Sequence, residues 1–312
     1  MKKLHVTLIL LLTVLTSIFM AACGGTSTGT TATPAATTGS TSAPAAGSPT
    51  CVASTLKTNG STALGPLVQA VAKDYQAACA GSSITTALTG SGAGLTAVSG
   101  GNADIGNSDV YADPKKFTGL VDHQVAVVVF SVVINSKVTG VTNLTSAQIN
   151  SIFTGKTTNW KDLGGPDLPI VAVNRPTGSG TRVTFEQFVN GGPVTVTGSS
   201  VVTASTTGDV AKNVSQTDGA ISYVAASAVA PNNLTAIKID GVDNSDANVL
   251  SNTYKFWNIE HMYTKGDAAG IAKAFIDYMT SDAAKAHAKT LGFLDVTTLS
   301  ADTLATRKPA GY

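Results

Sequence analysis

Three short turns place a serine or threonine beside a small residue, just where a helical pattern begins. They are Ser61-Thr62-Ala63, Ser91-Gly92 and Ser179-Gly180-Thr181. The start of a helix has unpaired backbone N–H groups and about half a positive charge, and small side chains let an oxyanion approach them. Each turn by itself is compatible with an ordinary helix cap. Three of them in one chain indicate an anion-binding site.

Two charged residues extend this pattern. Arg175 lies five residues before Gly180, on the predicted strand that leads into the third turn, and its planar guanidinium matches a tetrahedral oxyanion. Asp109 ends the segment ADIGNSD, which begins at Ala103. A carboxylate is unfavourable beside an anion unless the anion carries a proton that it can donate. Phosphate carries such a proton at neutral pH and sulfate does not, so the two residues together favour phosphate.

The elements that must position these residues alternate between strand, turn and helix, which predicts an α/β protein. We expect strands at 51–58, 83–88, 168–174, 220–224 and 234–239, and helices that include 64–75, 95–98, 268–279 and 282–289. Two β-rich segments, 124–135 and 254–264, are expected to cross between two lobes. The predicted lobes are 51–132 plus 254–312, and 133–253, with the binding site in the cleft between them.

The N-terminus has the pattern of an export signal. Lys2 and Lys3 precede an apolar run at 6–20, which is too short to favour a membrane span. The residues MAACG at 20–24 resemble a lipobox, so we expect a signal peptide at 1–22 and a lipid on Cys23. Thr, Ser, Gly, Ala and Pro dominate the rest of 23–50, which predicts a disordered tether. The protein would then be exported and held by its lipid at the outer face of the cytoplasmic membrane; an ordinary secreted protein is the alternative.

Cys51 and Cys79 are the cysteines that remain if Cys23 carries a lipid. Exported proteins meet oxidising conditions, so we expect a disulfide between the two. Two buried free thiols are the alternative.

The composition argues against several other functions. Lys and Arg number 20 and Asp and Glu 19, so the net charge of +1 predicts no nucleic-acid partner. No cofactor is expected. A metal site has no support, because the four histidines are scattered and none lies at metal-ligand spacing from a cysteine or a carboxylate; they are His5, His123, His261 and His287. The tripeptide at 155–157, GKT, lacks the glycine that a nucleotide-binding loop requires, since Asn150 stands there. A serine hydrolase is also not favoured. Its nucleophile elbow has one glycine two residues before the serine and another two residues after it, and neither Ser91 nor Ser179 has this pair.

Six segments together resemble the phosphate-binding proteins of bacterial ABC phosphate importers, the PstS family. They are GSTALGP from Gly60, TGSGAG from Thr89, ADIGNSD from Ala103, LTSAQINSIFTGKTTNWKDLGG from Leu144, VNRPTGSGTR from Val173 and GAISYV from Gly219. The resemblance covers nearly all of the mature chain. It implies the two-lobed type II periplasmic-binding-protein fold, capture of inorganic phosphate for an ABC importer permease, and no enzymatic activity.

Carried over residue by residue, the resemblance implies phosphate contacts from Thr62, Ala63, Ser91, Asp109, Arg175, Ser179, Gly180 and Thr181. Thr177 departs from family members that have an acid beside the arginine, which leaves the orientation of Arg175 open. Arg182 would supply either a second guanidinium or an exposed ion pair. We expect a monomer. A phosphatase-like enzyme on the same scaffold, and a phosphate-binding surface sensor or adhesin, are the alternative functions.

Overall fold

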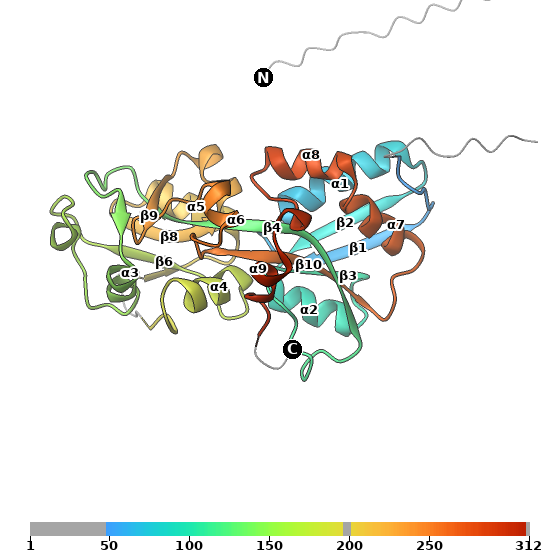
Figure 1. Ribbon diagram of the computed structural model, residues 1–312, viewed down its shortest axis with the longest axis horizontal. Coiled ribbons are helices and arrows are strands. Elements are labelled where there is room, and N and C mark those ends of the chain that lie inside the picture. Colours follow the sequence, from blue (N-terminus) through green and yellow to red (C-terminus); the bar gives the residue numbers. More distant parts are fainter. Residues whose placement is uncertain (1–47, 196–200, 310–312) are drawn as a thin grey trace, which may run out of the picture. The chain divides into compact units, whose positions relative to one another are not determined.

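Strands and helices alternate along the described residues, 48–195 and 201–309 of a computed structural model (Figure 1). The strands are β1 (Thr55–Gly60), β2 (Ser83–Leu88), β3 (Ile105–Ser108), β4 (Leu120–Ile134), β5 (Asn143–Leu144), β6 (Val171–Asn174), β7 (Val201–Thr203), β8 (Ala220–Ala225), β9 (Thr235–Ile239) and β10 (Trp257–Lys265). The helices are α1 (Gly65–Ala78), α2 (Ser91–Ser99), α3 (Ser146–Phe153), α4 (Gly180–Phe188), α5 (Thr207–Gln216), α6 (Asp246–Leu250), α7 (Gly270–Met279), α8 (Asp282–Thr290) and α9 (Ala301–Ala305). The predicted α/β class is confirmed.

The N-terminal predictions cannot be followed in this structure. The signal peptide, Cys23 and the tether up to residue 47 lie outside the described residues. Within the part of the chain that the structure describes, no helix is both long and apolar enough to cross a bilayer.

Strand β4 takes part in two groups of strands. Its first part, up to Val129, pairs antiparallel with β10, which pairs in turn with β3, and β1 joins β3 to β2. Its last part, from Phe130, pairs antiparallel with β8 and β9, and β8 continues through β6 to β7. One long strand therefore connects the two groups, as the apolar segment at 124–135 predicts. The lobe boundaries themselves stay a prediction.

Helix α1 buries one face against the first group of strands. Leu64, Leu67, Val68, Val71 and Tyr75, which the sequence assigns to one face, are all at most 1% exposed. In Figure 1 α1, α7 and α8 lie on one side of β1–β3, and α2 lies on the other. The strand before α1 starts at Thr55 and not at Cys51. Cys51 forms a disulfide with Cys79, the residue directly after α1. The predicted disulfide is thus present in the structure.

Helix α2 is longer than predicted, because it begins at Ser91 and includes the residues expected in a glycine-rich turn. Gly90, with φ of 95°, is the residue that ends the turn and caps the helix. Gly94 serves packing instead: a Cβ there would lie 2.5 Å from the Cα of Gly60. The glycines therefore allow α2 to lie close to β1, which brings Ser91 to the end of that strand.

The second group of strands is covered on both faces. Figure 1 shows α4 on one side of β6 and β8 and α5 on the other. Tyr223 of β8 stacks on Phe185 of α4 at a centroid distance of 4.0 Å, whereas Val224 belongs to the apolar cluster that α5 covers. Because successive side chains of β8 point to opposite faces of the sheet, Tyr223 packs toward α4 and Val224 packs toward α5. Neither α5 nor α6 is predicted from the sequence.

Candidate functional site

Ser61 organises the turn between β1 and α1. Its Oγ accepts hydrogen bonds from the backbone amides of Ala63 at 3.1 Å and Leu64 at 2.9 Å, so its own O–H is directed away from the helix. That hydroxyl donates to Oδ1 of Asp109. Helix α1 begins two residues after the end of the turn, at Gly65. The Ala63 amide, predicted as a phosphate contact, therefore donates to Ser61 in this structure.

Asp109 is the point at which three separate chain segments meet. It follows β3, is 2% exposed, and accepts from Ser61 through Oδ1 and from Thr181 Oγ1 through Oδ2 at 2.8 Å. Its backbone amide donates to Ser91 Oγ at 3.1 Å. Each oxygen of this carboxyl group thus accepts one hydroxyl hydrogen bond, which fixes the direction of the group.

Arg175, directly after β6, supplies a buried positive charge to the same region. Its side chain is enclosed, and Nη2 donates to Thr62 Oγ1 at 3.1 Å and to the carbonyl of Ser205 at 3.0 Å. Nε and Nη1 have no protein partner although both are buried. Burial lowers the pKa of the Arg175 guanidinium, and the charge of Asp109 opposes this shift. Two unsatisfied cationic donors in a buried position are the chemical signature of an oxyanion site.

The start of α4 is packed directly against these groups. Ser179 caps the helix by accepting from the amide of Arg182, and Gly180 is the first helical residue. A Cβ on Gly180 would lie 2.4 Å from Ser91 Oγ and 2.8 Å from Cβ of Asp109, so only glycine fits. The start of α4 therefore lies directly against Ser91 and Asp109, and the structure brings the third predicted turn together with the second.

Thr207, at the start of α5, is a site residue that the sequence analysis missed. Its amide donates to Thr62 Oγ1 at 3.1 Å, and the two hydroxyl oxygens lie 3.0 Å apart. The signal was available: Thr206-Thr207-Gly208 has the same hydroxyl-beside-glycine design as the three recognised turns. The sequence analysis places Ser61 in its turn but does not predict its hydrogen bond to Asp109.

Neighbouring groups orient Arg175 without the acid that some relatives have. Thr177 is exposed, and it is Thr62 and the Ser205 carbonyl that contact the guanidinium. Of the two alternatives for Arg182, the ion pair is present, although this pair with Glu186 is partly buried and not fully exposed. Arg182 donates from Nε to Glu186 at 2.8 Å and from Nη1 to the backbone carbonyl of Arg175 at 2.9 Å, so it braces the chain that carries Arg175.

An open hollow of about 580 Å³ lies beside the site, although Arg175 and Asp109 do not line it. It is lined by the start of α2 and by the loop before α4, and Ser179 forms part of its wall. The two sides touch where the Gly92 amide donates to the Gly178 carbonyl at 2.9 Å. An anion entering this hollow would meet the first turns of both helices.

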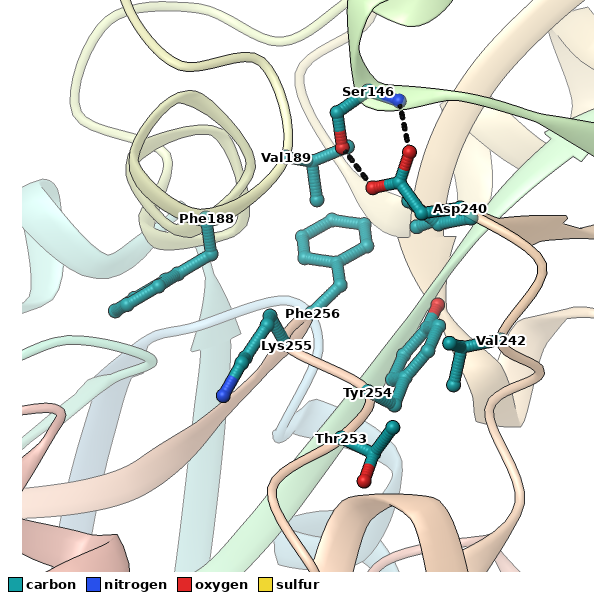
Figure 2. A pocket seen from close by; sticks show the side chains of 10 residues that line it. Ser146, Phe188, Val189, Asp240, Val242, Thr253, Tyr254, Lys255 and Phe256 are labelled. Atoms are coloured by element: carbon teal, nitrogen blue, oxygen red, sulfur yellow. Dashed lines mark hydrogen bonds between the residues drawn. The ribbon is translucent and has the colours of Figure 1, made fainter.

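A second cavity, of about 60 Å³, is a poor candidate for an anion (Figure 2). Its carboxylate, Asp240, already accepts from the amide and hydroxyl of Ser146 at 2.8 and 2.6 Å. Tyr254, which also lines it, donates to the carbonyl of Phe130 at 2.7 Å. Phe256 fills much of the remaining wall (Figure 2). For metal ions, the described residues contain no group of three or more His, Cys, Asp or Glu side chains that could act as ligands.

This fold and site agree with comparisons to known proteins. The family model described as a PBP superfamily domain matches residues 30–283. The phosphate-binding protein PstS of Bacillus subtilis is 41% identical over 246 residues, which are 78% of this chain and 81% of that protein. The chain therefore belongs to the PstS family of phosphate-binding proteins, within the PBP superfamily. Binding proteins of this family are components of transporters and not enzymes, so the phosphatase-like alternative loses its support.

Two solved structures are also similar. One is described as a phosphate ABC transporter substrate-binding protein from Clostridium perfringens with bound phosphate; its TM-score is 0.73, with 30% identity over 78% of this chain and all of the other. The other is an ABC-type phosphate transport receptor from Vibrio cholerae, with a TM-score of 0.62, 25% identity, and coverage of 77% of this chain and 99% of that chain.

Proposed function

We propose that this protein captures inorganic phosphate outside the cytoplasm and delivers it to the permease of an ABC importer. One observation carries the proposal: Arg175 is buried with Nε and Nη1 unsatisfied, within a network that also contains a buried carboxylate. Membership of the PstS family, and the phosphate bound in the similar Clostridium perfringens structure, support the same ligand.

The proposed ligand contacts divide into three kinds. Arg175 supplies the positive charge, and the first amides of α2 and α4 supply donors at helix starts. Hydroxyl groups of Thr62, Ser91 and Ser179 complete the donor set, whereas the Thr181 hydroxyl already donates to Asp109, so Thr181 would contribute its backbone amide. Asp109 accepts a hydrogen bond from the protonated oxygen of the phosphate ion. Contacts come from strands and helices far apart in sequence, so ligand binding would hold the two groups of strands together.

Asp109 gives this site its proposed selectivity. Sulfate and phosphate have similar size and shape, so the arginine and helix starts attract both. A sulfate oxygen beside the Asp109 carboxylate would have no proton between them, which leaves two like charges in contact. Phosphate avoids this conflict by donating a hydrogen bond.

Calorimetric titration of the mature chain with phosphate, arsenate, sulfate and molybdate tests this function. We expect binding of phosphate and, because arsenate also carries a proton at neutral pH, of arsenate, with sulfate and molybdate much weaker. Failure to bind phosphate, or equal binding of sulfate, would contradict the proposal. Transport itself is tested by phosphate uptake in cells that lack the chain, because a surface sensor or adhesin would leave uptake unchanged.

We also propose that Cys23 anchors the protein by a lipid and that residues 24–50 are its tether. The lipobox-like residues at 20–24 support this step. Mass spectrometry of the natively processed protein should find a lipid on Cys23 as the first residue, and Cys23→Ala should release the protein from the membrane fraction. An unmodified N-terminus at another position would instead favour an ordinary secreted protein.

The proposed lobes, 51–132 plus 254–312 and 133–253, would move as two bodies in a monomer. The division of β4 between two groups of strands supports this arrangement. Small-angle X-ray scattering of the mature chain should give a monomer whose radius of gyration decreases when phosphate binds. An unchanged radius at saturating phosphate would argue against lobe closure.

A further inference from the structure

Glu260, on β10, is a buried carboxyl group that the proposed site does not use. It is 0% exposed, and neither of its oxygens has a hydrogen-bond partner. Among the described residues, only Asp109 and Glu260 are fully buried acids. An unpartnered acid inside a protein is costly in its charged form, so its position requires an explanation.

The strand register places Glu260 against Asp109. Strand β10 is antiparallel to β3, with His261 opposite Ser108 and Met262 opposite Asn107. The paired residues end at His261 and Ser108, where β10 also shifts its register against β4, and the next residues along the two strands are Glu260 and Asp109. The two side chains are neighbours, since the charge of Asp109 acts on Glu260.

The hydrogen bonds decide which of the two acids carries the proton. Asp109 accepts from the hydroxyls of Ser61 and Thr181, as an ionised carboxylate does. Glu260 has no such donor, so its ionised form would be a second, unsatisfied negative charge beside the first. Burial, together with the neighbouring charge of Asp109, raises the pKa of Glu260 well above its usual range. A neutral Glu260 has one O–H, and Asp109 is the acceptor in reach.

The basic side chain next to Glu260 in the chain is His261, whose Nε2 is buried without a hydrogen-bond partner, but it is burial and Asp109 that raise the pKa of Glu260. On the other side of β10, the residue opposite Glu260 is Ala126 of β4. Helix α2, which packs on β10, contains no titratable residue in SGAGLTAVS. The next residue on the strand, His261, is paired through Nδ1 with Asp122 at 2.8 Å. The positive charge of the region belongs to Arg175, which acts on Asp109.

We propose that Glu260 is a positioning residue of the anion site, which stays protonated, donates its O–H to Asp109 and keeps Asp109 an ionised acceptor for the proton of the ligand. The inference rests on the proposed phosphate-binding function. Without this donor the charged form of Asp109 has one hydrogen bond fewer to stabilise it. A protonated Asp109 can donate to sulfate, so phosphate selectivity decreases first at acidic pH.

Two variants of similar size separate this role from simple packing. Glu260→Gln keeps an N–H donor, so phosphate affinity at neutral pH should stay within about threefold of wild type. Glu260→Met has no donor, so phosphate affinity should fall at least about tenfold. Titration with sulfate from neutral to mildly acidic pH should also show sulfate binding at a higher pH in Glu260→Met than in wild type or Glu260→Gln. Wild-type behaviour of Glu260→Met in both titrations, or an equal defect in both variants, would overturn the proposal.

Infrared spectroscopy gives a direct test even if Glu260→Met does not fold. The difference between wild type and Glu260→Gln at neutral pH should contain the C=O band of a protonated carboxylic acid. Carboxylate bands in its place would mean that Glu260 is ionised, which refutes the assignment. The band can be measured without ligand, so the charge state of Glu260 is determined independently of phosphate binding. If the wild-type protein bound no phosphate, the proposed function would be contradicted, while the infrared result for Glu260 would still stand.

Discussion

Replacement of Arg175 by methionine should nearly abolish phosphate binding and leave the fold intact. Methionine has a similar length and no charge, so it fills the same space without donors. Arg175 is 1% exposed and held by Thr62 and the Ser205 carbonyl through Nη2 alone. The substitution therefore removes few hydrogen bonds from the protein, and it also removes a desolvated cation, so thermal stability should change little.

The size of the effect follows from the two free nitrogen atoms. Nε and Nη1 are buried without a partner, and each can donate one charge-assisted hydrogen bond to phosphate. Such bonds contribute about 1.5–3 kcal/mol each, or about 3–6 kcal/mol together. At about 1.4 kcal/mol for each tenfold change, phosphate affinity should fall about 10²- to 10⁴-fold. Arg175→Lys keeps the charge but not the planar fork, so its loss should be smaller.

Calorimetry with phosphate, supported by circular dichroism and thermal unfolding, measures this prediction. Arg307→Met is the matched control, because Arg307 is also buried but stacks on Phe188 and Trp257, at 4.0 and 3.7 Å. Its phosphate affinity should stay within about threefold of wild type, since it is separate from the site. The reasoning is refuted if folded Arg175→Met binds phosphate as tightly as this control.

Three further changes test other parts of the site and scaffold. Asp109→Asn should narrow the preference for phosphate over sulfate, because an amide can donate to sulfate; paired titrations near neutral pH check this, and an unchanged preference would remove Asp109 as the selective group. Gly180→Ala should weaken phosphate binding at least about fivefold, because overpacking typically costs about 1–3 kcal/mol and the new Cβ would lie 2.4 Å from Ser91 Oγ. Gly208→Ala, whose Cβ would meet only Thr206 Oγ1 at 3.8 Å, is its control, and equal affinities in both variants would contradict the packing argument. Replacing Cys51 and Cys79 by serine should lower the free energy of unfolding by about 3–4 kcal/mol, measured by urea denaturation, with phosphate affinity unchanged; an unchanged unfolding free energy would show that the disulfide contributes little.

Local chemistry could be recognised from the sequence because it depends on residues that are neighbours in the chain. A hydroxyl beside glycine at a helix start identifies donors within three or four residues, which is why Ser91 and the segment 179–181 were correctly expected at the starts of α2 and α4. The apolar face of α1 follows from the same short-range periodicity. The disulfide could be predicted for a different reason, since only two cysteines remain once Cys23 is set aside.

The tertiary structure alone decided which of these local groups act together. Thr207 meets Thr62 across 145 positions of sequence, and no local pattern pairs two such threonines. Glu260 becomes relevant only because the pairing of β10 with β3 brings it next to Asp109. Register is determined by the burial of whole strand faces and not by the residue concerned, and a shift by one residue would turn Glu260 to the other side of the sheet. The chain thus determined the chemical groups of the site, while the packing of distant strands and helices determined their partners and the charge that each one carries.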